Sequence, residues 1–180
     1  MKIFLSYASA DKKLAERLKE ELVKSGLSVW SDSDMTAGED RRRRIEGAIR
    51  SASEILVLVG PKNVDDPWQQ LTWRAALEAV WQDPDKRLIP ILLRGADLPA
   101  FVLSGTSGNL KAIRVTHPRR IRSVAQVILD LIRGDRTLDS DRKGATIFSV
   151  STDADGERDT RLSEIAGYVH QLASSPRRND

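Results

Sequence analysis

Apolar residues in this chain of 180 residues gather into short runs, separated by longer stretches in which apolar and charged positions are interleaved. Five runs have the length of β-strands: residues 2–7, 27–30, 54–60, 87–93 and 110–115. The third run, EILVLVG, is the most apolar and does not alternate, which is typical of a strand covered on both faces. The runs therefore predict a buried sheet.

The stretches between the runs have the spacing of amphipathic helices. In the first, Leu14, Leu18 and Leu22 stand four residues apart and Gly26 ends the pattern. Helices are predicted in residues 10–27, 41–52, 66–81 and 121–134, with one helical turn near residues 98–103. Because strands and helices alternate, the predicted fold class is α/β: a five-stranded parallel sheet in the order 2-1-3-4-5, flanked by helices.

The character of the sequence changes after Gly134. Residues 1–134 form the predicted domain, and residues 135–180 are predicted to be a C-terminal extension. The extension begins as a polar linker, contains a short apolar segment at 145–150, and continues into an amphipathic helix at 161–173 with a disordered tail. Docking of this helix on its own domain is favoured over binding to a partner.

A fold of this kind binds ligands outside the carboxyl ends of its strands, where the connections change direction. In the order 2-1-3-4-5, that point lies between the first and third strands. The residues that this rule selects are at strand ends and on the first turns of the third helix: Tyr7, Ser9, Asp11, Trp30, Asp32, Trp68 and Thr72. Structural roles compete for several of them, since Ser9 or Asp11 could cap a helix and Trp68 could fill the core.

Composition excludes several kinds of site. The chain has no cysteine and two histidines, so disulfides, thiolate nucleophiles and a multi-histidine metal site are excluded, and no metal is predicted. Neither the dinucleotide signature G-x-G-x-x-G nor a P-loop is present, and there is no G-x-S-x-G elbow. No apolar run reaches the roughly 18 residues of a membrane span, so a cytoplasmic protein without membrane contact is expected.

Basic residues exceed acidic ones by three, which is too small an excess to indicate nucleic acid as a partner. The run Arg41 to Arg44 lies on a predicted helix, where four successive side chains point all round the axis, so a solvated surface is predicted. Trp73 and Trp81 are assigned to packing.

Three segments in the observed order resemble the signature boxes of a bacterial-type Toll/interleukin-1 receptor (TIR) domain. They are FLSYASADKKLAERLKEEL, LSVWSDSDMTAGEDRRRRIEGAI and SEILVLVGPKNVDDPW, and the resemblance covers about residues 1 to 133. It implies a flavodoxin-like module that associates with itself or with other TIR domains. The family's assembly loop then corresponds to Met35, Thr36, Ala37, Gly38, Glu39 and Asp40.

Many bacterial and plant TIR domains cleave NAD+ at its nicotinamide glycosidic bond, using a glutamate four residues after the tryptophan that opens the third helix. Here Thr72 stands four residues after Trp68, and Arg41 follows G-E-D where many bacterial relatives have tryptophan. Two functions follow from the resemblance. One is a signalling and assembly module that requires no cofactor and holds NAD+ or a related nucleotide without cleaving it; the other is an NAD+ glycohydrolase (NADase), for example in bacterial defence. Thr72 favours the first.

Overall fold

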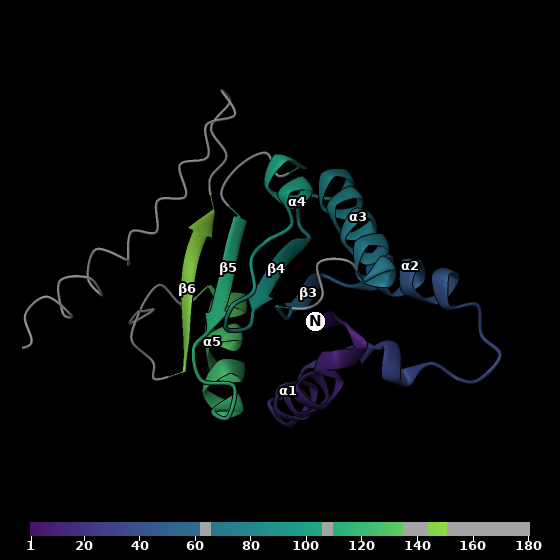
Figure 1. Ribbon diagram of the computed structural model, residues 1–180. Helices are drawn as coiled ribbons and strands as arrows, with labels where there is room; N and C mark the ends of the chain where they lie inside the picture. Colours follow the sequence, from purple (N-terminus) through teal and green to yellow (C-terminus); the bar gives the residue numbers. More distant parts are fainter. Residues whose placement is uncertain (62–65, 106–109, 135–143, 151–180) are drawn as a thin grey trace, which may run out of the picture.

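A single sheet of six strands forms the centre of the molecule (Figure 1). The computed structural model describes residues 1–61, 66–105, 110–134 and 144–150. The strand order is β2-β1-β3-β4-β5-β6. The strands are β1 (Lys2–Tyr7), β2 (Ser28–Ser31), β3 (Glu54–Val59), β4 (Arg87–Leu92), β5 (Leu110–Val115) and β6 (Ala145–Val150).

Helices connect the parallel strands. They are α1 (Lys12–Lys24), α2 (Arg41–Ser51), α3 (Pro67–Gln82), α4 (Ala100–Gly105) and α5 (Ile121–Arg133), with short 3-10 turns η1 (Ser9–Asp11) and η2 (Asp32–Asp34). Each strand and helix predicted within residues 1–134 occurs within a few residues of its predicted bounds. Gly26 and Gly134 follow α1 and α5 with φ of 86° and 70°, a left-handed conformation that glycine adopts without strain and that ends a helix.

The helices cover the two faces of the sheet as separate layers. On one face, α1 and α5 pack with Ile3, Leu5 and Leu56. On the other, α2, α3 and α4 pack with Phe4, and all six residues of β3 are buried between the two layers. Since α1 and α2 lie on opposite faces, the connections change direction between β1 and β3, as the flavodoxin-like prediction requires.

The sheet has one strand more than predicted. The apolar segment at residues 145–150 pairs antiparallel with β5, with Leu110 opposite Val150 and Val115 opposite Ala145. The prediction of a purely parallel five-stranded sheet was therefore wrong at this edge, although the fold class is confirmed. The reason is that a six-residue apolar segment between polar stretches does not indicate, from its own sequence, which strand it will pair with. The segment becomes a strand because the free edge of β5 offers it hydrogen-bonding partners.

Residues 135–143 and 151–180, including the predicted helix at 161–173, lie outside the described residues. Within the part that is described, no helix is both long and apolar enough to cross a membrane.

The tryptophans of α3 differ in their environment. Trp73 is buried as predicted, but Trp81 is 62% exposed, so its assignment to packing was wrong. Eight residues along a helix turn the side chain by about 80°, which takes Trp81 off the face that Trp73 presents to the sheet.

Candidate ligand site at the carboxyl edge of the sheet

Hydrogen bonds cap the start of α3 and hold it against the end of β3. Asp66 stands at the N-cap of α3, and its Oδ1 accepts hydrogen bonds from the backbone N–H groups of Trp68 (2.9 Å) and Gln69 (3.1 Å). The buried Gln69 side chain donates from Nε2 to the carbonyl oxygen of Leu58 at 2.7 Å. These bonds hold the first turn of α3 at the carboxyl edge of the sheet, the location expected for a ligand.

Three side chains from separate elements meet at this edge, and we call Asp32, Arg41 and Trp68 the clasp. The guanidinium carbon of Arg41 lies 4.4 Å from the centroid of the Trp68 ring, within cation–π range. Arg41 Nη2 also donates to Asp32 Oδ2. The clasp joins η2, α2 and α3, and Trp68 remains 41% exposed.

Thr72 lies one turn below Trp68 and is buried, with 2% of its surface exposed. Its hydroxyl donates to the carbonyl oxygen of Trp68 at 2.9 Å. This is a local bond to the helix backbone, a common use of threonine within a helix. The hydroxyl therefore already has an acceptor within α3.

The residues that follow β1 have other surroundings. Tyr7 is half-buried and packs against the layer of α1 and α5, on the face of the sheet opposite to α2 and α3. Ser9 is exposed. Asp11 occupies the N-cap position of α1, but its side chain makes no capping hydrogen bond. The clasp thus unites Asp32 and Trp68 from the predicted set, whereas Tyr7 belongs to the other layer.

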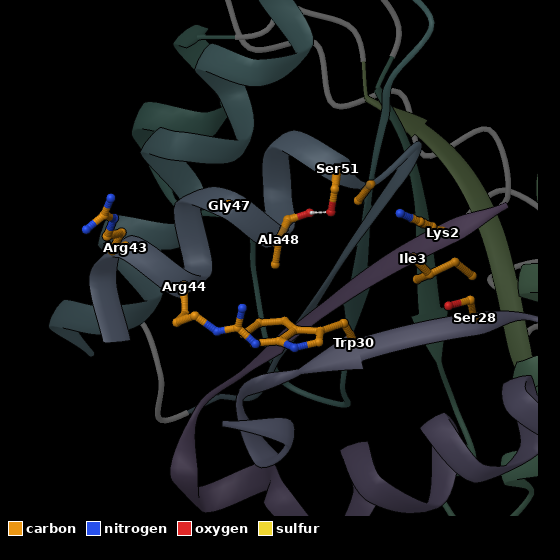
Figure 2. A pocket seen from close by; sticks show the side chains of 10 residues that line it. Lys2, Ile3, Ser28, Trp30, Arg43, Arg44, Gly47, Ala48 and Ser51 are labelled. Atoms are coloured by element: carbon orange, nitrogen blue, oxygen red, sulfur yellow. Dashed lines mark hydrogen bonds between the residues drawn. The ribbon is translucent and has the colours of Figure 1, made fainter. Parts of the chain in front are cut away.

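Trp30 is held on the α2 side of the sheet. Its ring stacks on Phe4, its partner in the β1–β2 register, with centroids 5.6 Å apart. The guanidinium carbon of Arg44 lies 5.9 Å from the centroid of the same ring. Trp30 lines a groove beside α2 (Figure 2).

The predicted assembly loop, residues 35–40, projects from the body of the molecule between η2 and α2 (Figure 1). Thr36 donates its backbone N–H to Glu39 Oε2 at 3.0 Å, and Glu39 Oε1 lies 3.3 Å from Arg44 Nε. Asp40 caps α2 by accepting from the backbone N–H of Arg43 at 3.2 Å. Gly38 has φ of 90°, a left-handed conformation that glycine adopts without strain.

A buried carboxyl group with a raised pKa, that of Glu54, lies at the opposite, amino end of the strands. Burial raises the pKa of Glu54 above its usual value, and the hydrogen bond and charge of Arg87 oppose this without cancelling it. Arg87 Nη2 donates to Glu54 Oε1 at 2.6 Å and to the carbonyl oxygen of Ile132 at 2.7 Å. The pair ties β3, β4 and α5 together.

Sequence reasoning missed Gln69, and it treated Arg41 as part of a solvated surface and as a departure from a family pattern. A signal for Gln69 was available, because a glutamine on the sheet-facing side of an amphipathic helix must find a partner when buried. Nothing in the sequence indicates the contact of Arg41 with Trp68. Among residues 1–61, 66–105, 110–134 and 144–150, no group of three or more potential ligands suits a metal ion.

Comparison with known proteins connects this geometry to one family. The sequence model described as TIR domain matches residues 3–128. The fold is similar to the TIR domain of the Toll-related receptor TRR-2 from Hydra magnipapillata, at 22% identity and a TM-score of 0.55, covering 73% of this chain and 95% of that one.

It is also similar to Clostridium botulinum CMP N-glycosidase, BcmB, at 16% identity and a TM-score of 0.50, covering 73% of this chain and 99% of that one. No curated protein sequence matches the chain.

Proposed function

This chain belongs to the TIR-domain family, and we propose that it acts as a signalling module that self-associates and holds NAD+ or a related nucleotide without cleaving it. The observation that carries the proposal is the state of Thr72, which is buried and bonded to the carbonyl oxygen of Trp68. Catalytic members of the family that the sequence resembles have a glutamate at the position that matches Thr72.

The chemistry of the glycosidic bond explains why this residue matters. Cleavage between nicotinamide and ribose builds positive charge on the ribose, and a nearby carboxylate stabilises that charge. Threonine has no charge to offer. With its hydroxyl committed to α3, Thr72 also lacks a free donor to orient a ribose hydroxyl.

Among the described residues, the acids near Thr72 are poor substitutes for the missing glutamate. Asp66 accepts two N–H groups at the start of α3, and Asp32 is paired with Arg41. Glu78 stands six residues beyond Thr72, about 9 Å along the helix and on a different face. Its Oε1 accepts a hydrogen bond from Gln82 at 3.1 Å.

The clasp supports binding more than cleavage. Arg41 places a positive charge on the exposed ring of Trp68, where it would repel a developing cation. The same guanidinium suits a phosphate group, to which arginine can donate two parallel hydrogen bonds. A dinucleotide would therefore be attracted by its phosphates, and among the described residues no carboxylate is placed to assist cleavage.

Self-association is supported by the form of residues 35–40. The loop projects from the body, and its internal hydrogen bonds reduce the entropy that would be lost when it docks. Met35 is half-buried and Ala37 is exposed, which gives the loop some apolar surface for contact with a second copy.

The competing function is cleavage of an N-glycosidic bond. The observation in its favour is the fold shared with BcmB, which its name describes as a CMP N-glycosidase. At 16% identity this likeness concerns the fold, and the described part of the chain has no suitably placed acid, which weighs against transfer of the activity.

The decisive experiment measures nicotinamide release from NAD+ by the purified protein, at high protein concentration and with a crowding agent. Thr72→Glu and Thr72→Gln are assayed in parallel, and circular dichroism establishes that each variant is folded. We expect no release by the unaltered protein or by Thr72→Gln. Release by the unaltered protein would overturn the non-catalytic function, and release by Thr72→Glu alone would support a cleft that lacks only its acid.

Binding and assembly are measured separately. Titration calorimetry with NAD+ tests the cleft, with Arg41→Gln as the variant expected to bind more weakly. Light scattering across a concentration series tests assembly, with Met35→Asp expected to reduce the average mass. Val23→Asp is the matched control, because Val23 is an exposed apolar residue on α1. A monomer at all concentrations would contradict self-association.

A further inference from the structure

A groove of about 400 Å³ lies between the β2 edge of the sheet and α2 (Figure 2). Its lining includes Lys2 and Ser28 near the amino ends of β1 and β2, Trp30 further along β2, and Gly47 and Ala48 on α2. None of the clasp residues lines it. Its volume falls in the range of small-molecule sites, about 300–1,000 Å³.

The groove is electropositive. Three of its lining residues are cationic, Lys2, Arg43 and Arg44, and none is acidic. Within the described residues, Lys2 and Arg43 have no ion-pair partner, and Arg44 has Glu39 at 3.3 Å. In Figure 2 the guanidinium of Arg44 lies against the Trp30 ring, and the Lys2 ammonium group points into the groove from the other end. An anion between these two groups would be attracted by both.

Neither the backbone conformation nor the packing at position 47 requires glycine. It lies in the interior of α2, its φ is negative, and a Cβ built on it would meet nothing within 4 Å. Glycine in a helix interior is less stable than alanine by roughly 0.5–1 kcal/mol. Gly47 lines the groove, and because it has no side chain it leaves space in the groove that a larger residue would fill.

We propose that this groove binds a small organic phosphate that carries a flat ring. The ring lies in the space between the Trp30 side chain and the low wall at Gly47 and Ala48. The cationic groups of Lys2 and Arg44, at the two ends of the groove, attract the phosphate. The site is separate from the carboxyl edge, so the proposal does not depend on whether that edge holds a nucleotide.

The test uses adenosine 5′-monophosphate as the probe and titration calorimetry on the full chain. We expect saturable binding at low millimolar concentration or better, weakened by added salt. Lys2→Gln and Arg44→Gln are each expected to weaken binding roughly tenfold, because each removes a positive charge that attracts the phosphate. Arg42→Gln is the matched control on α2, since Arg42 pairs with Glu46 and does not line the groove.

Gly47→Leu tests the hollow itself. A Cβ at position 47 would meet nothing within 4 Å, and leucine favours the helix, so the variant should unfold at the same temperature as the unaltered protein or higher. Filling the groove should weaken binding of the probe by at least about tenfold. Gly47→Ala, which adds one methyl group, is the milder second variant with an intermediate effect.

Four outcomes would overturn the proposal. They are absence of saturable binding, equal binding by folded Gly47→Leu, equal affinity for adenosine, and equal affinity for inorganic phosphate. Equal affinity for adenosine would mean that the phosphate does not contribute to binding. Equal affinity for inorganic phosphate would mean that the ring does not contribute. Arg41→Gln separates the two sites: binding that is lost in this variant and kept in Gly47→Leu would place the probe at the clasp.

Discussion

Two arginine–carboxylate pairs lie at opposite ends of the sheet, and the same chemistry has different consequences in each. At the amino end, Glu54 is 3% exposed and pairs with Arg87, which also donates to carbonyl oxygens at the end of α5. At the carboxyl end, the Asp32 side chain is 22% exposed and pairs with Arg41 beside Trp68. The two arginines are similarly exposed, at 43% for Arg87 and 38% for Arg41, so the pairs differ in the carboxylate: Glu54 is buried, whereas Asp32 keeps contact with solvent.

The difference follows from solvent. A carboxylate removed from water depends on its partner, so breaking a buried pair leaves an uncompensated charge. A carboxylate that keeps contact with water loses little when its partner is removed. The following changes test this contrast, beginning with the largest expected effect.

Arg87→Ala should give the largest loss of stability. It leaves Glu54 buried without its cation and removes the hydrogen bonds to the end of α5. Because the Arg87 side chain is itself half-exposed, we expect a loss of about 2 kcal/mol, below the 3–5 kcal/mol typical of a fully buried pair. Urea unfolding at neutral pH measures it. A loss no larger than that of Arg41→Ala would remove the contrast between the two ends.

The pH dependence of stability should identify Glu54 as the buried member. A folded-state pKa above the unfolded value of 4.5 means that the folded protein binds this proton more tightly. The contribution of Glu54 is therefore fully present below pH 4.5 and is lost as the pH rises through its folded pKa.

Glu54→Gln stays neutral and should lack this change. The difference in unfolding free energy between the unaltered protein and Glu54→Gln should fall as the pH is raised from the acid side towards neutrality. A difference that grows with pH would mean that Arg87 dominates and that the pKa is lowered.

Arg41→Ala should affect stability little and ligand contact more. We expect a loss of about 0.5–1 kcal/mol from an exposed ion pair and one cation–π contact. Trp68 should become more accessible to a soluble quencher such as acrylamide, because the guanidinium no longer covers its ring. Arg42→Ala on the same helix is the control, and it should leave quenching unchanged.

Added salt should change the stability of these variants least, and it should affect the Asp32–Arg41 pair more than the Glu54–Arg87 pair. At about 1 M ionic strength, screening acts over roughly 3 Å, so the stability lost in Arg41→Ala should largely disappear. The loss in Arg87→Ala should persist, since water and ions do not reach Glu54. Equal salt dependence for the two variants would contradict the difference in burial.

Much of the framework follows from local sequence pattern. The apolar runs predict five of the strands, and the spacing of leucine and isoleucine predicts the main helices with their glycine ends. The order of these elements also predicts the edge at which Asp32 and Trp68 meet. Periodicity and capping are properties of neighbouring residues, so they can be recognised before any long-range contact is known.

The tertiary structure decided the features that depend on residues distant in sequence. The segment at 145–150 becomes β6 because the edge of β5 accepts it, and Arg41 becomes part of the clasp because α2 and α3 lie side by side. Thr72 reads as a polar position in the sequence, and only the packed helix shows it buried with its hydroxyl bonded to Trp68. Local pattern specifies which elements form, whereas burial and partner choice arise when those elements pack.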